Sequence, residues 1–202
     1  MKTILHLTSS IFGEGGQSSR LAKEFVAAQP GVRVIERDLA RDPVPHLDAG
    51  RFGAFLAKPE ARTPAQAAVV GYSDALIAEL KAADTIVLGL PMYNFGLPSQ
   101  LKAYFDHVAR AGVTFKYTNK GAVGLLGGKK AYVFAARGGL YQGTPRDTQT
   151  GYVRDFLAFL GITDVKFVYA EGLAISEASK AQSLATARRA LRELVQPETI
   201  AA

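Results

Sequence analysis

The fold is decided by a nearly continuous apolar run in the middle of the chain, Asp84-Thr85-Ile86-Val87-Leu88-Gly89-Leu90. A run of this length and composition predicts a β-strand whose two faces are both buried. Strands buried on both faces are typical of parallel sheets, in which neighbouring strands are joined through helices that cover the sheet. This segment therefore predicts an α/β protein with helices on both faces of a parallel sheet.

The rest of the chain alternates between short apolar segments and longer segments with helical spacing. Four more strands are predicted at residues 4–7, 32–37, 131–136 and 165–170. Five helices are predicted at residues 18–29, 63–83, 98–109, 147–160 and 176–195. Right-handed crossovers between the strands produce a doubly wound sheet of five parallel strands. The length of 202 residues suits one domain over residues 1–202.

Two connecting segments have an unusual composition. Residues 39–49 are rich in Pro and Asp, and we expect them to form a loop. Residues 113–128 are rich in Gly and aromatic side chains, and we expect an excursion on the ligand-binding side of the sheet that forms a short hairpin.

Charge and composition exclude several classes of function. The 24 Lys and Arg residues against 18 Asp and Glu residues leave a net charge of +6, but the charges are scattered, which favours a basic surface over a nucleic-acid partner. Cysteine is absent, which excludes disulfides, zinc–thiolate sites, iron–sulfur clusters and cysteine nucleophiles. Apolar runs are too short for a signal peptide or a membrane span, so we expect a cytoplasmic protein with no membrane partner.

The three histidines show no metal-ligand spacing, so no metal site is predicted. His6 lies inside a predicted strand and is expected to be a hydrogen-bonded histidine of the sheet. His107 lies on a predicted helix beside Asp106 and is expected at the surface. His46 falls in the predicted loop.

The loop after the first strand, residues 8–20, suits a phosphate group. It combines hydroxyl side chains, glycines and a helix N-terminus. It is neither a P-loop, because no Lys precedes Ser18, nor a dinucleotide fingerprint, because Ser18 stands where the third glycine is needed. A single phosphate is therefore the better prediction. The alternative is that Ser18 only caps the helix.

Two further loops should lie at the same edge, because ligands of such sheets bind beyond the carboxyl ends of the strands. In residues 91–98, large side chains flank one amide, which suits a flat heteroaromatic ring; the alternative is a packed turn. In residues 137–143, two glycines allow close approach of the backbone to a ligand; the alternative is a plain turn. These loops offer no acid, base or nucleophile, and no G-x-S-x-G motif occurs, so a cofactor should carry the chemistry. One phosphate and one flat ring indicate FMN.

These loops also carry a resemblance to a known family. The chain resembles the FMN-dependent NADH:quinone oxidoreductases, also called azoreductases, of the flavodoxin-like fold. The resemblance covers essentially the whole chain, and its carriers are Ser9-Ser10 with Gln17-Ser18, Pro91-Met92-Tyr93-Asn94-Phe95 running into residues 100–106, and residues 112–118, 137–139 and 161–164. It implies a flavodoxin-like doubly wound sheet with strand order 2-1-3-4-5.

The resemblance also implies which residues bind FMN. Those that would hold the phosphate are Ser10, Gly16, Gln17 and Ser18. Those that would hold the isoalloxazine ring are Met92, Tyr93, Asn94 and Phe95, with Ala136, Arg137, Gly138 and Gly139 along its other edge. The family often has Ser where this chain has Gly16 and Ala136, so weaker or altered contacts to FMN are expected there. The substrate pocket would be lined by Phe115, Tyr117, Tyr141 and Phe159, with Phe159 reaching across a dimer.

The function implied by the resemblance is that of a homodimeric enzyme with one FMN per subunit at the interface. NADH or NADPH would pass a hydride to FMN, and a quinone or an aromatic azo compound would then take two electrons at the same face in a ping-pong cycle. FMN carries the chemistry, so no catalytic side chain is assigned. The alternatives are a flavodoxin-like electron carrier without its own small-molecule substrate, and a non-enzymatic nucleotide-binding module. Such carriers are usually acidic, whereas this chain is basic.

Overall fold

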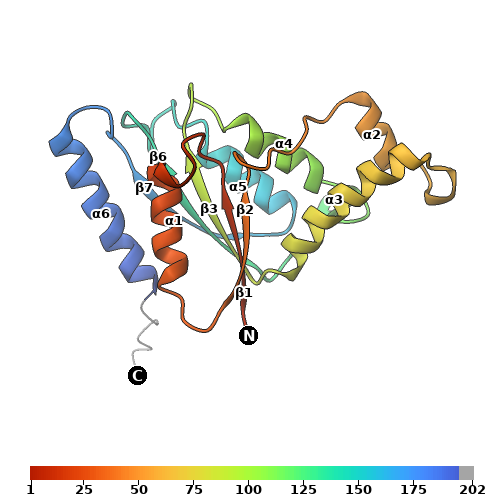
Figure 1. Ribbon diagram of the computed structural model, residues 1–202, viewed down its shortest axis with the longest axis horizontal. Helices are drawn as coiled ribbons and strands as arrows, with labels where there is room; N and C mark the ends of the chain where they lie inside the picture. The colour runs from red at the N-terminus through yellow and green to blue at the C-terminus, as the bar shows by residue number, and fades with distance from the viewer. Residues whose placement is uncertain (196–202) are drawn as a thin grey trace.

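The computed structural model describes residues 1–195 and has a parallel sheet of five strands at its centre (Figure 1). The order across the sheet is β2-β1-β3-β6-β7, and every neighbouring pair is parallel. The strands are β1 (Thr3–Thr8), β2 (Arg33–Asp38), β3 (Thr85–Pro91), β6 (Lys130–Ala136) and β7 (Asp164–Ala170). The predicted flavodoxin-like arrangement of five parallel strands is confirmed.

A separate antiparallel hairpin, β4 (Phe115–Thr118) and β5 (Gly121–Gly124), accounts for the gap in the strand numbers. The predicted order 2-1-3-4-5 counted only the strands of the central sheet, so it differs from the order in the full numbering. The hairpin itself lies in the segment where the Gly-rich and aromatic composition predicted one.

Helices cover both faces of the sheet (Figure 1). One face carries α1 (Gln17–Ala27) and α6 (Glu177–Val195), which pack against each other and against the sheet. The other face carries α3 (Pro64–Ala82), α4 (Ser99–Val108) and α5 (Thr150–Phe159). Single 3-10 turns lie at Gly13–Gly15 and Pro59–Ala61. No helix within residues 1–195 is long and apolar enough to cross a membrane.

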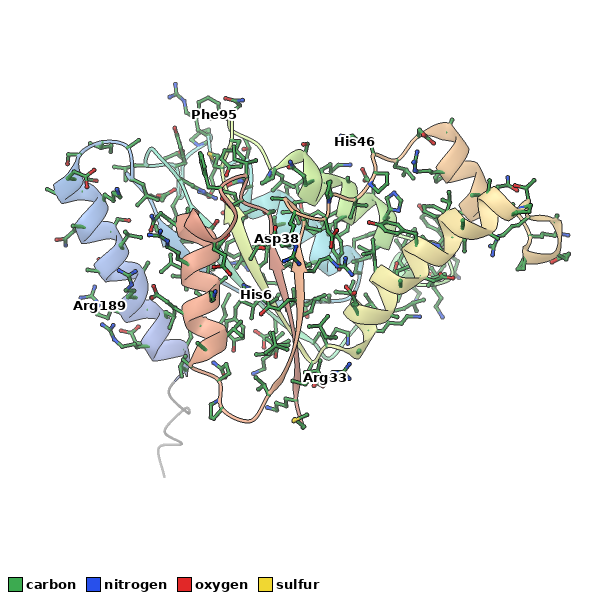
Figure 2. The ribbon with its side chains drawn as sticks, in the orientation of Figure 1. His6, Arg33, Asp38, His46, Phe95 and Arg189 are labelled. Carbon is green, nitrogen blue, oxygen red and sulfur yellow. The ribbon has the colours of Figure 1, made fainter. Side chains whose placement is uncertain are left out.

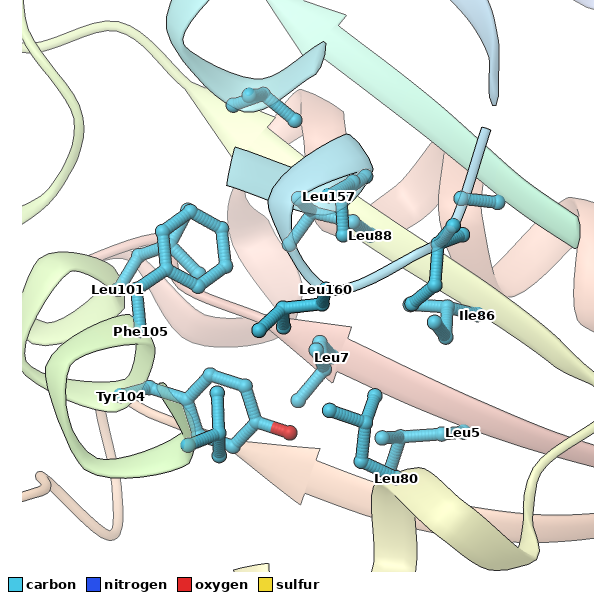
Figure 3. Packing of buried hydrophobic residues seen from close by; sticks show 14 of the residues in the cluster. Leu5, Leu7, Leu80, Ile86, Leu88, Leu101, Tyr104, Phe105, Leu157 and Leu160 are labelled. Atoms are coloured by element: carbon cyan, nitrogen blue, oxygen red, sulfur yellow. The ribbon is translucent and has the colours of Figure 1, made fainter. Parts of the chain in front are cut away.

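The alternation of side chains along β1 divides the core into two clusters. Leu5 and Leu7 face the cluster beneath α3, α4 and α5, which Figure 3 shows from close by. Ile4 faces the opposite cluster, together with Phe25 of α1. Since β3 contributes to both clusters, its continuous apolar sequence is explained by burial on both of its faces.

One helix, α2 (Ala49–Leu56), was not predicted. Its sequence contains Gly50 and Gly53, and glycine is a poor helix former. The helix is started by Asp48, whose side chain accepts a hydrogen bond from the backbone N–H of Arg51 at 2.8 Å. The loop prediction for residues 39–49 therefore holds up to the first residue of this helix.

The expectation that His107 lies at the surface is wrong. Its side chain is buried, and the rings of Phe55 and Tyr72 each meet it edge-on at 5.8 Å between centroids. Phe55 comes from the unpredicted helix α2, which is why the sequence of α4 alone misplaced the histidine. Burial lowers the pKa of His107, because a charged imidazole is poorly solvated there. His6, in contrast, is a buried sheet histidine as expected, with Nδ1 at 2.7 Å from Glu36, although its Nε2 has no hydrogen-bond partner within residues 1–195.

Candidate functional site

Three of the sheet's strands end at one edge, and their loops meet there. The register pairs Thr8 with Gly89 and Pro91 with Ala136, so β1, β3 and β6 finish close together. Figure 2 shows Phe95 projecting at this edge. The first two loops touch through Tyr93, whose hydroxyl lies 3.2 Å from Ser10 Oγ and accepts a hydrogen bond from a backbone N–H of the first loop. The predicted convergence of the loops is therefore seen.

The first loop presents an unpaired hydroxyl at the start of α1. Ser18 is fully buried, and its Oγ has no hydrogen-bond partner within residues 1–195. The alternative that Ser18 caps the helix is wrong, because the N-cap is Gly16 and no side chain caps it. The first backbone N–H groups of a helix have no intrahelical partners and attract anions. Buried hydroxyl and free N–H groups together fit a phosphate.

Gly16, the N-cap of α1, packs closely against Ser10 of the same loop. A Cβ on Gly16 would lie 2.2 Å from Ser10 Oγ in its present position. Ser10 is itself buried, and its Oγ accepts a hydrogen bond from Phe12 N–H at 3.2 Å. A side chain at position 16 would therefore displace Ser10. Ser10 therefore occupies the place that a side chain at position 16 would need, and the departure from the family pattern at Gly16 keeps the backbone N–H of this residue.

The second loop has a strained backbone. Asn94 and Phe95 have φ values of 49° and 63°, which few side chains adopt. A reciprocal pair of backbone hydrogen bonds between Tyr93 and Gly96 encloses them, at 3.3 and 2.9 Å. Phe95 is 52% exposed, so the loop is not the packed turn of the alternative prediction. Residues in such conformations are enriched at ligand-binding sites.

The third loop presents backbone rather than charge. Gly138 and Gly139 accept backbone hydrogen bonds from Ala174 (3.0 Å) and Gly172 (2.9 Å), which fix the loop against the end of β7. The Tyr141 hydroxyl lies over Gly139, only 2.6 Å from where a Cβ would stand. This glycine therefore permits the close approach of a ring. Ala136 is buried at the end of β6.

Arg137 does not present its side chain at the open edge. Its guanidinium is fully buried beneath the loops, where it donates to Asp147 at 2.8 Å and to Glu171 at 3.0 Å. The pKa of Asp147 is lowered: burial raises it, but hydrogen bonds from Arg137 and Thr150 outweigh that effect. If Arg137 contacts a ligand at this edge, as the resemblance implies, only its backbone can make the contact.

The four aromatic residues predicted for the substrate pocket lie in two places. Tyr141 lies at the open edge, where its ring meets that of Phe95 at 5.6 Å between centroids. Phe115 is buried between Phe159, at 4.2 Å, and Tyr117, at 5.4 Å. This second group lies at the hairpin. Within one chain, the four residues therefore do not line a single pocket.

Sequence reasoning missed the polar residues beneath the loops, Asp147, Gln149 and Glu171. Their partners lie up to 58 residues away along the chain, and no local pattern signals them. No cluster of three or more His, Asp or Glu residues suited to a metal occurs in the described part of the chain.

The fold defines a flavodoxin-like α/β protein whose three loops meet at the carboxyl ends of β1, β3 and β6. Residues 2–195 match the model of the protein family described as flavodoxin-like fold. An FMN-dependent NADH:quinone oxidoreductase of Cellvibrio japonicus is 54% identical over 197 residues, which cover 96% of this chain and 98% of the relative. Another, from Burkholderia lata, is 53% identical, covering 95% and 98%.

Solved structures agree with these relatives. An azoreductase from Bacillus anthracis superposes with a TM-score of 0.88 at 28% identity, over 96% of this chain and 99% of that one. An FMN-dependent NADH-azoreductase from the same species, in complex with FMN, superposes with a TM-score of 0.85 at 26% identity, over 97% and 100%. The chain thus belongs to the flavodoxin-like fold family and, within it, to the family of FMN-dependent NADH:quinone oxidoreductases. The resemblance inferred from the sequence is confirmed.

Proposed function

We propose that this chain is an FMN-dependent oxidoreductase that uses NADH or NADPH to reduce quinones by two electrons and to cleave aromatic azo compounds. The observation that carries the proposal is the buried Ser18 hydroxyl at the start of α1, which has no partner within residues 1–195. It lies in the loop that Tyr93 joins to the strained loop at residues 91–98. The names of the relatives support the same activity.

The residues of the edge would share the binding of FMN. Those proposed for the phosphate are Ser10, Gly16, Gln17 and Ser18; those for the ring are Met92, Tyr93, Asn94, Phe95 and the backbone of residues 136–139. When bound, FMN supplies the two-electron chemistry. The chain's own groups would bind and orient the FMN. The rings of Phe95 and Tyr141 would exclude water from one side of the isoalloxazine ring.

An anaerobic absorbance experiment tests the proposal. Protein loaded with FMN is given NADH, or NADPH in a parallel sample, and then benzoquinone. Bleaching of the flavin by the nicotinamide and recovery on addition of the quinone are expected. Bound flavin that neither nucleotide bleaches would favour the electron carrier. No binding of flavin at all would overturn the proposal.

Ser18→Ala is expected to weaken FMN binding by roughly 10-fold and riboflavin binding by much less, because only FMN has the phosphate that the hydroxyl would meet. The measurement is a fluorescence titration with each flavin. Ser19→Ala is a matched control, since the Ser19 hydroxyl is also buried and unpaired but lines a separate cavity with His6. Equal losses for both flavins in Ser18→Ala would show that Ser18 does not face the phosphate.

We further propose a homodimer that places FMN at the interface. The support is an apolar cavity of about 280 Å³ between α2 and the hairpin, rimmed by Phe52, Leu56 and Tyr117, of which Tyr117 is 73% exposed. Phe159 and Tyr117 pack against Phe115 rather than against the chain's own ring-binding loops. A second copy would bring them to the partner's loops and complete the predicted pocket.

Leu56→Asp is expected to convert the protein from two chains to one in sedimentation velocity, since it puts a charge on this apolar rim. Ala181→Asp, at an exposed position of α6, is the control and should leave the mass unchanged. A monomeric wild-type protein would contradict the homodimer.

The cytoplasmic location stays a prediction, which fractionation of the native cell tests.

A further inference from the structure

The two loops proposed for the flavin ring are joined beneath the sheet edge by one side chain, Gln149. It is fully buried and directly precedes α5. Its amide nitrogen donates to the carbonyl oxygens of Pro91 (2.9 Å) and Gly96 (3.0 Å). Its amide oxygen accepts from Nε of Arg137 at 3.2 Å. These partners settle the orientation of the amide, because carbonyls accept only and a guanidinium donates only.

The loop at residues 91–98 needs support from outside itself. Left-handed backbone at Asn94 and Phe95 is unfavourable and persists only where the surroundings determine it. Gln149 binds a carbonyl on each side of this pair, at Pro91 and Gly96. Thr148, its neighbour in sequence, donates from its hydroxyl to the carbonyl of Phe95. The strained pair is therefore held at three carbonyls from one short segment.

The loop at residues 137–143 is connected to the Gln149 side chain through Arg137. Arg137 donates to Glu171 at 3.0 Å, and the Glu171 carboxylate accepts from the backbone N–H groups of Tyr141 and Gln142, both at 3.0 Å. A continuous chain of hydrogen bonds thus runs from one ring-binding loop through Gln149 to the other. These protein contacts link the positions of the two loops.

We propose that Gln149 is a positioning residue, which fixes the spacing and the backbone conformation of the two loops and thereby the fit of the isoalloxazine ring. The proposal rests on the proposed function for its ligand. Gln149 is not expected to touch that ligand, because it is buried, both of its amide hydrogens are donated to Pro91 and Gly96, and its oxygen accepts from Arg137. Its role should therefore differ from that of Ser18: it concerns the ring rather than the phosphate.

Three variants separate the possibilities. Gln149→Met keeps the length of the side chain and removes all three hydrogen bonds. Gln149→Glu keeps an acceptor for Arg137 but cannot donate to the two carbonyls. Gln182→Met, at an exposed position of α6, is the control for the chemical change. Thermal unfolding of each variant establishes that it is folded before binding is measured.

Titrations with FMN and riboflavin give the first readout. Both flavins should bind roughly 10- to 100-fold more weakly to Gln149→Met, and by the same factor, because the ring is common to both. Gln149→Glu should show the same loss. Wild-type affinity in Gln149→Glu would overturn the proposal, since Gln149 would then serve Arg137 alone. A loss for FMN only, or no loss in Gln149→Met, would also overturn it.

Hydrogen exchange of the ligand-free protein gives a readout that does not depend on flavin. Backbone amides of residues 92–97 should exchange faster in Gln149→Met and Gln149→Glu than in wild type and Gln182→Met. Unchanged exchange in the Gln149 variants would overturn the proposal for Gln149, whether or not the protein binds flavin. Failure of the wild-type protein to bind flavin would overturn the proposed function instead. The reduction potential of bound FMN should also shift in both Gln149 variants but not in the control.

Discussion

Gly124→Ala is expected to lower the free energy of unfolding by about 3 kcal/mol, the upper end of what overpacking typically costs. A Cβ at Gly124 would lie 2.0 Å from the backbone nitrogen of Gly161 and 2.1 Å from the carbonyl carbon of Leu160. Both atoms belong to backbone at the end of α5, so no side-chain rotation can relieve the clash. The hairpin would have to move away from the end of α5.

The measurement is thermal unfolding, in which Tm should fall by roughly 6–12 °C for a protein of this size. Gly127→Ala is the matched control, because its Cβ would lie at an ordinary 3.7 Å from the Gly161 carbonyl oxygen. Displacement of the hairpin should also expose Phe115 and so reduce activity toward quinones. A Tm equal to that of Gly127→Ala would mean that the two backbones separate at little cost.

The sheet and its helices could be predicted from the sequence, because each strand carries a short apolar run and each connecting segment has helical spacing. The run at residues 84–90 alone indicated a strand buried on both faces, and β3 contributes to both core clusters. The helix α2 could not be predicted in this way, because it contains two glycines and is stabilised by packing against α3. His107 was misplaced for the same reason, since its cover comes from Phe55 of that helix.

The loops of the candidate site could be located from their composition, but the direction of each side chain could not. Arg137 was expected beside the ligand and instead points inward, because its two carboxylate partners come from separate segments at Asp147 and Glu171. Tyr141 and Phe159 were placed in one pocket, yet their ring contacts are with Phe95 and Phe115 respectively. Contacts between distant segments leave no trace in local spacing, and Gln149 was missed on that account.

Arg137→Met is expected to cost about 3–5 kcal/mol at neutral pH, because it leaves buried carboxylates without their cation. The side chains of Asp147 and Glu171 are 8% and 12% exposed, so water compensates little for the loss. Arg146→Met changes an exposed arginine of the same loop and should cost less than about 0.5 kcal/mol. Urea denaturation of both variants gives the comparison.

The pH dependence of that loss identifies its origin. In the wild-type protein the pKa of Asp147 is lowered, since hydrogen bonds from Arg137 and Thr150 outweigh burial. Its contribution to stability is therefore present above the unfolded pKa of about 3.9 and is lost as the pH falls through the lower, folded pKa. In Arg137→Met the effect of burial dominates and the folded pKa rises, so the carboxyl takes up a proton below neutral pH and the charge disappears. The stability deficit of the variant should consequently shrink between pH 7 and pH 5, roughly the range over which a raised carboxyl pKa would act. A deficit that stays constant over this range would mean that lost packing of the guanidinium over Tyr169, rather than uncompensated charge, causes the destabilisation.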